Sequence, residues 1–480
     1  MTTAIECDVV VVGAGLAGLV VANRVAEAGL TVRVLEKSID DAYLCNSRYT
    51  GGLFHVAMDD MTAEPHQVRA NLERATRGTT KPELADALAL NARRTLRWLS
   101  AQGVRLMKAG PDGLRRNALA PPGMRKTGLN WRGRSGDVML RTLGDRLAGR
   151  GGVLMRGVTA EHLVMDGSRC AGLQATMSAG GAVSVRARAV VLADGGFQGN
   201  PELVRRFISA RPERILQRNA GTGIGCGLLM AEAVGAKLVG TDRFYGHVQH
   251  RLAMTDGGLW PYPVVDSLCT AAMVVDGSGQ RFCDEGLGGV FVTNAIAKLE
   301  DPLSAVIIFD DAIWNGPGRD WILPANPYLI QAGGNVISAP TIVDLAKKIS
   351  LDPVVLQRSV EHYNAMVDRG ASDQGQPERT TAVYKPWPIK TGPFHAIEVC
   401  AGLTYTMGGI ATNAHAAVLD CGDRPIPGLY AAGSTTGGLE GGGAAAGYSG
   451  GLSKASVFGL LAGDAIVSEL QQKQAERLAS

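Results

Sequence analysis

An unbroken apolar run lies near the start of the chain, at residues 9–12, and ends in a glycine-rich turn. A stretch whose apolar residues have helical spacing follows, and then a second apolar run that ends at Glu36. Short runs without polar alternation are typical of strands that are buried on both faces of a parallel sheet. The pattern therefore predicts a strand–helix–strand unit that reaches about Lys37.

A later run, residues 183–196, first alternates and then becomes fully apolar before it ends in another glycine turn. This pattern indicates a further strand that enters a buried parallel sheet. Residues 45–52 are small and polar and show neither period, so we expect no helix or strand there. The remaining pattern predicts helices over roughly 65–105, 135–150, 221–236 and 455–470, and strands at 153–155, 160–165, 416–420 and 427–433.

The composition of the chain changes between about Arg243 and Cys400, where most of the aromatic residues and prolines and several histidines lie. We interpret this part as a separate domain inserted into the first. The expected division is a first domain over 1–243, an inserted domain over 244–402 and a return to the first domain over 403–480. The polar stretch 370–379 predicts an exposed loop within the insertion.

Composition excludes several classes of protein. The 480 residues are 46% hydrophobic and 19% charged, the ordinary balance of a soluble globular protein. The net charge of +3 is too small to favour nucleic acid or an anionic membrane as a partner. No apolar stretch is long enough to cross a bilayer, and the glycine turn begins soon after Met1 without a secretion leader, so we expect a cytoplasmic protein. The eight cysteines show no metal-ligand spacing, which predicts reduced thiols and no metal site.

The first glycine turn has the parts that a dinucleotide needs. Gly13 permits a sharp turn, Gly15 lets the backbone approach a pyrophosphate, and Gly18 lets the helix pack closely on the strand. The N-terminus of the following helix offers free N–H groups to the phosphates. Glu36 is placed to accept hydrogen bonds from a ribose. The alternative is a glycine-rich turn in some other α/β protein.

Several further motifs resemble one family of flavoproteins. They are Asn46 and Ser47 with Gly51 and Gly52, residues 193–197, residues 406–409, the strand at 427–433, and Gly450 with Gly451. With the glycine turn and Glu36, they resemble the fumarate reductase/succinate dehydrogenase flavoprotein family over almost the whole chain. Residues 46–52, 244–247 and 281–286 are most similar to its tricarballylate dehydrogenase branch. Urocanate reductases and 3-ketosteroid dehydrogenases are relatives with the same architecture.

The resemblance implies an α/β fold, with a Rossmann-like FAD-binding domain of the glutathione reductase type and an inserted α+β capping domain. It also implies FAD, and we expect it to be bound non-covalently because no counterpart of the family's histidine attachment site is found. The residues implied to bind FAD are Gly13, Gly15, Leu16, Ala17, Gly18, Glu36, Lys37, Asn46, Ser47, Thr50, Gly51, Gly52, Ala160, Ala193, Asp194, Gly195, Gly433, Ser434, Gly451 and Leu452.

The chain departs from fumarate reductases at three positions where the resemblance leads one to expect basic residues. Residues 286–291 contain no arginine to serve as the proton donor. Tyr405 stands in place of a histidine, and Tyr448 in place of an arginine that clamps the substrate carboxylate. These departures argue against a small dicarboxylate held by arginines.

The tyrosines suggest another chemistry. Ketosteroid dehydrogenases have a tyrosine at a position similar to that of Tyr448, and it polarises a ketone. We expect Tyr448 to be the electrophilic donor, and His247, His250 or Tyr405 to be the proton acceptor. Arg48 and Arg251 are the candidates for holding a substrate carboxylate. In the alternative interpretation, the tyrosines only pack against the flavin loop and His250 is structural.

Two other charged residues have open roles at this stage. Glu440 lies in a glycine loop expected near the flavin, where it either binds a ribityl hydroxyl or faces solvent. Arg281 is expected to form a structural ion pair with Glu285 or Asp284 rather than to bind substrate.

Three functions remain open on the sequence. The first is an FAD-dependent dehydrogenase that desaturates a C–C bond beside a ketone or carboxylate, with a separate electron acceptor. The second is the reverse reaction, reduction of an enoate with a separate electron donor. The third is a flavin electron carrier without substrate chemistry, which the set of ionisable residues in the cap disfavours.

Overall fold

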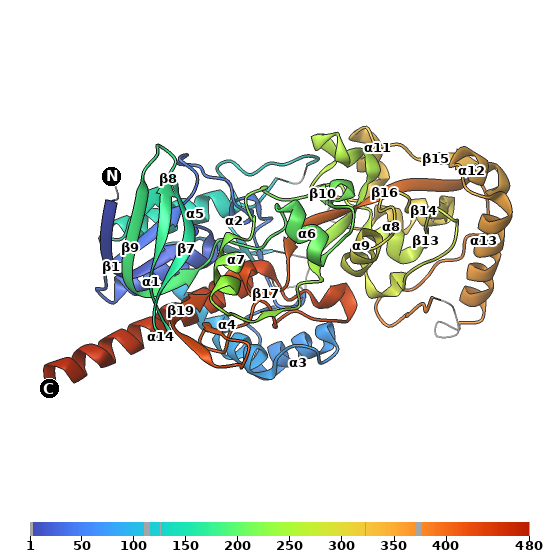
Figure 1. The fold of residues 1–480 in the computed structure, drawn as a ribbon. Coiled ribbons are helices and arrows are strands. Elements are labelled where there is room, and N and C mark those ends of the chain that lie inside the picture. The colour runs from blue at the N-terminus through green and yellow to red at the C-terminus, as the bar shows by residue number, and fades with distance from the viewer. Residues whose placement is uncertain (1–2, 110–115, 125, 322, 371–376, 480) are drawn as a thin grey trace.

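The structure is a computed structural model, and it describes residues 3–109, 116–124, 126–321, 323–370 and 377–479. Two regions lie side by side in Figure 1, a large mixed sheet with its helices on the left and a smaller sheet with its helices on the right. The long strand β16 (Phe394–Thr406) runs from the second region toward the first.

The larger sheet has eight strands, and parallel strands form its centre. In β1, residues 9–12 pair in parallel with both β2 and β9, so this apolar run is covered by neighbours on both edges. The order is β18-β19-β9-β1-β2-β6, with the β7–β8 hairpin attached to β9. The strand bounds are β1 (Thr3–Val12), β2 (Val32–Glu36), β6 (Val153–Arg156), β7 (Val158–Asp166), β8 (Arg169–Met177), β9 (Ala182–Leu192), β18 (Ala417–Leu419) and β19 (Pro425–Ala431).

Helices cover the sheet and bury its apolar side chains. Helix α1 packs on both α14 and α5, and α14 also contacts α4. Together they enclose one hydrophobic core, while β7, β8 and α7 border a second core on the other side of the sheet. The bounds are α1 (Leu16–Glu27), α2 (Asn46–Tyr49), α3 (Pro65–Thr76), α4 (Pro82–Ala101), α5 (Ser135–Ala148), α6 (Pro201–Phe207), α7 (Cys226–Ala233) and α14 (Gly451–Ala479).

The second region is built around a six-stranded sheet in which β16 is the central strand. Its apolar face and the surrounding helices form the largest hydrophobic core. The strands are β10 (Leu216–Gln217), β12 (Phe244–His250), β13 (Met273–Val275), β14 (Val306–Asp310), β15 (Ile337–Ala339) and β16; the helices are α8 (Asp266–Ala271), α9 (Gly289–Ala297), α10 (Asp311–Asn315), α11 (Ala325–Gln331), α12 (Ile342–Lys348) and α13 (Pro353–Asp368).

Two minor sheets complete the fold. A three-stranded sheet has the order β3-β5-β4, and β11 pairs with β17. Their bounds are β3 (Leu53–Phe54), β4 (Leu106–Ala109), β5 (Arg116–Leu119), β11 (Leu238–Val239) and β17 (Gly409–Ile410). Short 3₁₀ turns lie at Pro212–Arg214, Arg251–Met254, Gly257–Leu259, Glu285–Leu287, Pro317–Arg319, Gly433–Thr435 and Ala444–Gly447.

Most of the predicted elements are confirmed, and two expectations are wrong. Asn46–Tyr49 forms a short helix, α2, although its residues are small and polar. Its helical turn is held at Cys45, whose carbonyl accepts the N–H groups of Arg48 and Tyr49, so tertiary position rather than periodicity decides it. Within 370–379, residues 371–376 lie outside the described residues, and Arg379 is fully buried rather than exposed.

The expected domain boundaries stay a prediction. Strand β16 continues without a break across residues 402 and 403. Short strand β10, which precedes residue 244, pairs with β16. Residues 216–217 and 403–406, which the expected division gives to the first domain, therefore belong to the six-stranded sheet of the second region.

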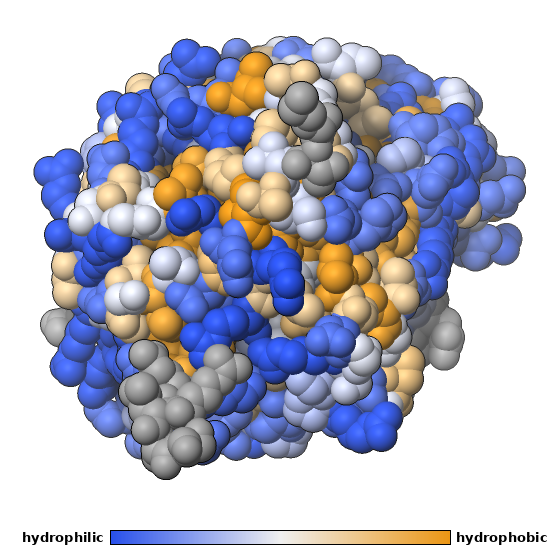
Figure 2. Space-filling view, turned by 60° about the vertical axis from the view of Figure 1, so that its left-hand side comes forward, coloured by the Kyte–Doolittle hydropathy of each residue, from blue (hydrophilic) through white to orange (hydrophobic). Residues whose placement is uncertain are grey.

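Among the described residues, Ala444–Lys473 is the one segment that is apolar and long enough to cross a membrane by length and composition. Of its apolar window, 72% is buried inside the protein, where α14 packs on α1. Its burial identifies it as a core helix of the fold, and in Figure 1 only its end extends beyond the sheet. Figure 2 shows hydrophobic patches separated by hydrophilic side chains on the face in view.

Candidate functional site

The turn between β1 and α1 brings three backbone segments into direct contact. Gly13 has a φ of +96°, and a Cβ atom there would lie 2.6 Å from the carbonyl oxygen of Ala193. A Cβ atom at Gly18 would lie 2.0 Å from the carbonyl oxygen of Gly13. Side chains at either position are thus excluded by backbone atoms, which do not move aside easily. The first turn of α1 therefore presents its N–H groups to an open cavity.

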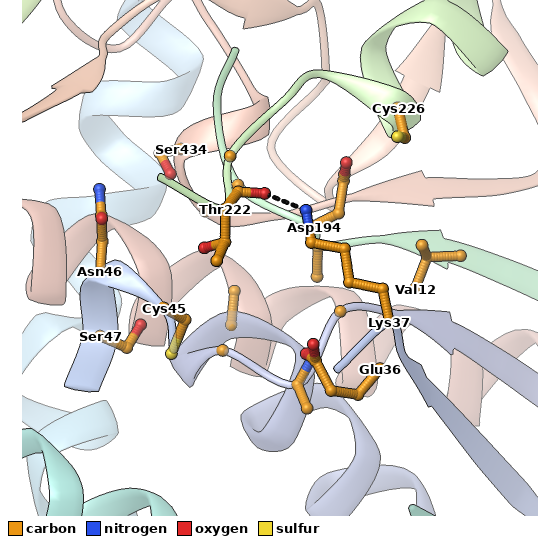
Figure 3. A pocket seen from close by; sticks show the side chains of 18 of the residues that line it. Val12, Glu36, Lys37, Cys45, Asn46, Ser47, Asp194, Thr222, Cys226 and Ser434 are labelled. Atoms are coloured by element: carbon orange, nitrogen blue, oxygen red, sulfur yellow. Dashed lines mark hydrogen bonds between the residues drawn. The ribbon is translucent and has the colours of Figure 1, made fainter. Parts of the chain in front are cut away.

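This cavity lies at the carboxyl ends of β1, β2 and β9, where Val12, Glu36 and Asp194 line it (Figure 3). Two buried acceptors on its wall, Asp194 Oδ1 and Gln198 Oε1, have no hydrogen-bond partner among the described residues. The predicted residues that line it are Gly13, Gly15, Leu16, Ala17, Glu36, Lys37, Asn46, Ser47, Ala160, Ala193, Asp194, Gly195, Gly433 and Ser434.

Glu36 and Lys37 close one end of this cavity. The Glu36 carboxylate accepts the N–H of Ala14 at 3.3 Å and that of Ser38 at 3.0 Å. Burial raises the pKa of Glu36, and the two N–H groups oppose that rise. Lys37 extends across the cavity to the carbonyl of Thr222, at 2.5 Å (Figure 3). Backbone N–H groups therefore hold the Glu36 carboxylate at the end of β2, in the orientation that hydrogen bonding to a ribose requires.

Asp194 follows β9 and accepts the N–H of Gly227 at 2.8 Å, near the N-terminus of α7. Burial raises the pKa of this carboxyl to about 6. Its side chain points toward Cys226 in Figure 3. Asp194 thus anchors α7 to the cavity wall.

A second cavity continues from the first. The residues common to both are Asn46, Ser47, Ser434 and Ala455. Helix α2 fixes this junction. Asn46 Nδ2 donates to the carbonyl of Thr404 at 2.8 Å, and Ser47 Oγ accepts the N–H of Leu16 at 3.0 Å. The predicted Thr50, Gly51, Gly52, Gly451 and Leu452 line the second cavity.

A buried ion pair supports the wall of the second cavity beside the start of α14. Lys454 Nζ lies 3.0 Å from Glu440 Oε2, and both side chains are at most 1% exposed. Glu440 Oε1 accepts the hydroxyl of Tyr405 at 3.1 Å and the N–H of Ser449 at 3.0 Å. Glu440 therefore does not face solvent, and its charge, acting with burial, holds the pKa of Tyr405 well above its usual range. The Tyr405 hydroxyl hydrogen is engaged by Glu440.

The Tyr448 hydroxyl has its acceptor positions filled. The N–H of Met58 donates to His55 Nδ1 at 3.1 Å, so in the neutral imidazole the hydrogen is on Nε2. That Nε2 lies 3.4 Å from the Tyr448 hydroxyl, and the N–H of Gly451 points to the same oxygen at 3.4 Å. The hydroxyl hydrogen of Tyr448 is thus left to donate to the neighbouring Tyr245 hydroxyl or to a ligand. Burial raises the pKa of Tyr448, which keeps the phenol protonated.

Tyr245 stacks on Tyr448, with ring centroids 3.9 Å apart and planes at 16°. Its hydroxyl lies 2.9 Å from His247 Nε2, and His247 Nδ1 lies 2.6 Å from Asp266 Oδ2. Tyr245, His247 and Tyr448 line the second cavity and also a third one. These side chains come from β12, α8 and the segment before α14.

Four of the predicted residues do not line the cavities: Gly18, which packs against the Gly13 carbonyl, and His250, Arg48 and Arg251. His250 lies with both ring nitrogens engaged, by the N–H of Leu252 and by the backbone of Asn335. Arg48 is 1% exposed and pairs with Asp137. Arg251 pairs with Glu398 at 2.5 Å. For these three side chains a local partner satisfies the polar group, which makes a role in binding substrate unnecessary.

Some residues at the site were missed by the sequence analysis, namely His55, Tyr245, Asp266 and Lys454. Tyr245 is two positions before His247, so the alternation along a strand places both side chains on one face; this signal was available. His55 and Lys454 carry no local signal, because their neighbours come from distant parts of the chain. The expected structural pair of Arg281 with Glu285 is confirmed, at 2.6 Å.

Comparisons with known proteins support the same interpretation. A family model described as FAD binding domain matches residues 8–449. An NADH:fumarate oxidoreductase of Klebsiella pneumoniae is 27% identical over 472 residues, which cover 95% of this chain and 47% of that protein. This chain therefore spans about half the length of that relative.

Two further comparisons agree. A fumarate reductase (cytochrome) of Shewanella frigidimarina is 28% identical over 467 residues, covering 95% of this chain and 76% of that protein. The solved structure of 3-ketosteroid delta1-dehydrogenase from Sterolibacterium denitrificans, in complex with 1,4-androstadiene-3,17-dione, matches with a TM-score of 0.74 and 21% identity. The match covers 97% of this chain and 100% of that one, and it shows a shared fold. The likeness to tricarballylate dehydrogenases stays a prediction.

The residues present fit FAD. Gly13 and Gly18 leave no room for a Cβ atom, so the backbone there is uncovered and a pyrophosphate can approach it. The unpartnered acceptors on the wall of the first cavity fit the hydroxyl and amino donors of an adenosine. The second cavity begins where the first ends, at Asn46 and Ser434, so one elongated cofactor can reach from the first cavity into the second.

Glu36→Gln is expected to weaken FAD binding about tenfold, since a hydrogen bond to a charged group contributes about 1.5–3 kcal/mol and tenfold corresponds to about 1.4 kcal/mol. The measurement is flavin fluorescence quenching on reconstitution of the apoprotein. Glu6→Gln, on the exposed part of β1, is the matched control and should bind FAD as the wild type does. Equal affinities of the two variants would remove Glu36 from the ribose site.

Proposed function

Because this chain belongs to the FAD binding domain family, we propose that it is an FAD-dependent dehydrogenase that acts on a CH–CH bond next to a ketone or carboxylate. FAD, when bound, supplies an acceptor for the hydride that leaves one of the two carbons. The residues of this chain have two remaining tasks. They must hold the carbonyl oxygen, and they must remove a proton from the carbon beside it.

The observation that carries the proposal is the hydroxyl of Tyr448. It is a protonated phenol at the junction of the second and third cavities, its oxygen faces two N–H groups, and its hydrogen can turn to a ligand. Such a donor stabilises negative charge that develops on a carbonyl oxygen. The buried wall around it excludes water, which strengthens that interaction.

The charges around the second cavity favour a ketone over a dicarboxylate. Of the described residues that line it, the permanent cations are Arg218 and Lys454. Arg218 donates to the carbonyl of Pro261 at 2.9 Å and to Thr404 Oγ1 at 2.9 Å. Lys454 has Glu440 and two backbone carbonyls as partners. Both cations are committed to the protein, so a second carboxylate on a substrate would find no matching charge among the described residues that line the second cavity.

Reduction of an enoate is the second candidate. The two relatives described above are a fumarate oxidoreductase and a fumarate reductase by name. The same donors can serve either direction, because a site that stabilises one transition state stabilises it from both sides. In both directions a separate protein or small molecule exchanges electrons with the flavin. Non-covalent FAD and a cytoplasmic location remain part of the proposal.

The test is the visible spectrum of the flavin. The oxidised holoenzyme is mixed without oxygen with cyclohexanone, 4-oxocyclohexanecarboxylate or 4-androstene-3,17-dione, and the flavin absorption band in the visible range is followed. We expect a ketone to bleach this band and to become desaturated. Failure of the ketones, together with reoxidation of dithionite-reduced protein by fumarate, would favour the reductase. Failure of every compound in both directions would remove the proposed function.

A further inference from the structure

We propose that Tyr245, His247 and Asp266 form a proton relay, in which Tyr245 takes the proton from the carbon next to the substrate carbonyl. Tyr245 is the catalytic residue of the relay, and His247 and Asp266 are positioning residues that act through it. This inference rests on the proposed function. The sequence left His247, His250 and Tyr405 open as proton acceptors. Tyr245, which the sequence analysis did not single out, takes this role in their place.

The hydrogen-bond distances set the direction of the relay. A carboxylate can only accept, so the short contact of 2.6 Å to Asp266 requires the hydrogen on His247 Nδ1. In the neutral imidazole, Nε2 then carries a lone pair. The Tyr245 hydroxyl, 2.9 Å from Nε2, must therefore be the donor in that contact. The oxygen of Tyr245 keeps its own lone pairs for a proton from the substrate.

Neighbouring elements fix each member of the relay. The second oxygen of Asp266 accepts the N–H of Val248 at 2.9 Å, which locks the carboxylate against β12. Thr293 in α9 donates to the carbonyl of His247 at 3.1 Å. At Gly289, the first residue of α9, a Cβ atom would lie 2.2 Å from Asp266 Cγ, so only glycine leaves room for this carboxylate. Strand β12, helix α8 and helix α9 thus hold Asp266 and His247 in place.

Tyr245 needs such an acceptor because it does not ionise readily by itself. Burial raises its pKa far above the usual range of a phenol. Transfer of its hydrogen to His247 lets the oxygen accept a proton without a free phenolate. The imidazolium that forms has Asp266 beside it, which stabilises the charge.

The relay also connects two different cavities. Tyr245 and His247 line both the second and the third cavity, whereas Asp266 lines only the third. Tyr245 lies against Tyr448, where the carbonyl is proposed to bind, at a ring distance of 3.9 Å. A proton taken near Tyr448 can therefore leave through the third cavity, which Asp266 lines.

The step balances as a proton transfer coupled to loss of hydride. The C–H bond at the carbon next to the carbonyl breaks, and its proton forms an O–H bond on Tyr245. The former hydroxyl hydrogen of Tyr245 moves to His247 Nε2. The electron pair of the broken C–H bond forms the C=C bond as the neighbouring carbon loses its hydride. Two electrons leave with that hydride, and the substrate is oxidised.

Other titratable or charged groups near the relay are few. Helix α9 contributes none, since its residues are uncharged. Those that face Tyr245 or His247 from neighbouring elements and cavity walls are Asp266, Tyr405, Tyr448, Arg218, Tyr262, Asp320, Tyr384 and Lys385. Of these groups, Asp266 is the one that hydrogen-bonds to the imidazole. Asp266 is therefore the group that acts on the relay through His247.

The test measures proton removal apart from oxidation. The holoenzyme is incubated without oxygen in D₂O with the three ketones named above, and proton NMR follows exchange at the carbons beside the carbonyl. Tyr245→Phe is expected to slow enzyme-dependent exchange at least thirtyfold, and His247→Gln at least tenfold, with unchanged flavin content. His395→Gln is the matched control, because His395 also pairs with an aspartate, Asp311, at 2.9 Å and is buried outside the cavities.

Asp266→Asn distinguishes a relay from a merely structural contact. Loss of the Asp266 charge should lower the maximal rate of exchange at saturating ketone, since the imidazolium is no longer stabilised. A merely structural contact would instead change the flavin content or the ketone concentration that gives half-maximal exchange, and it would leave the maximal rate unchanged.

Four outcomes separate the two proposals. Exchange that depends on Tyr245 and has a lower maximal rate in Asp266→Asn supports the relay, with or without flavin bleaching. Wild-type exchange without bleaching in either direction would overturn the desaturase function alone. Equal exchange by wild type and Tyr245→Phe, or a wild-type maximal rate in Asp266→Asn, would overturn the relay alone. Wild-type protein that neither exchanges nor bleaches with any ketone would overturn both.

Discussion

Gly13→Ala should yield protein with less than about one-tenth of the wild-type flavin content. The φ of +96° strains any residue with a Cβ atom, by about 1–3 kcal/mol. The new Cβ atom would also lie 2.6 Å from the carbonyl oxygen of Ala193 and 2.7 Å from Cα of Asp194. These are backbone atoms on β9 and its turn, so relief requires the strands to move apart. That movement would displace the N–H groups that face the pyrophosphate.

The readout for Gly13→Ala is the ratio of the flavin absorbance to the protein absorbance after purification, with the thermal midpoint as a second measure. Gly29→Ala is the matched control. Gly29 has a similar φ of +78°, but no atom of the described residues lies within 4 Å of the place that a Cβ would occupy, so it shares the strain without the collision. A full flavin complement in Gly13→Ala would show that the turn is not the pyrophosphate cradle.

Tyr448→Phe should slow flavin reduction by the ketone substrate about a hundredfold or more. Removal of one preorganised donor to a developing oxyanion typically costs about 10²–10³ in rate. The ring and its stacking on Tyr245 remain, so flavin content and the fold should be unchanged. The loss should appear in the rate of bleaching at saturating ketone, because the hydrogen bond strengthens as charge develops on the oxygen.

Tyr363→Phe is the control for Tyr448→Phe. Tyr363 in α13 is also buried, and its hydroxyl donates to the carbonyl of Ala271 at 3.1 Å, away from the reacting groups. It should reduce flavin at the wild-type rate, although its thermal midpoint falls. Wild-type bleaching by Tyr448→Phe would remove this hydroxyl from the mechanism and, with it, the observation on which the proposed function depends.

The cofactor half of the site was predictable from the sequence, because short stretches of chain specify it. The turn at Gly13 and the acid at Glu36 belong to one strand–helix–strand unit, whose geometry depends on neighbours in sequence. The glycine turn after β9 was predictable for the same reason. Its contact with Gly13 follows from the parallel pairing of β1 and β9.

The catalytic half was predictable only in part. Tyr448 and His247 were identified as candidates, and both line the cavity. His250 was a candidate too, but the strand alternation of β12 gives it the opposite face, where Asn335 engages its ring. Arg48 was expected to face substrate, yet it is buried against Asp137. A charged residue in the sequence indicates that its side chain needs a partner when it is buried. The sequence does not indicate which residue or ligand that partner is.

What the sequence by itself determined is the nucleotide-binding unit, since glycine positions and apolar runs act on residues close to them in the chain. What only the tertiary structure decided is which side chains meet above it. Strand β12 carries Tyr245 onto Tyr448, α8 carries Asp266 to His247, and β3 with α14 brings His55 beside the same phenol. These contacts join residues from separate elements, and their geometry depends on how those elements pack against one another. Hydrogen-bond partners of buried groups are therefore chosen by packing, which local pattern does not encode.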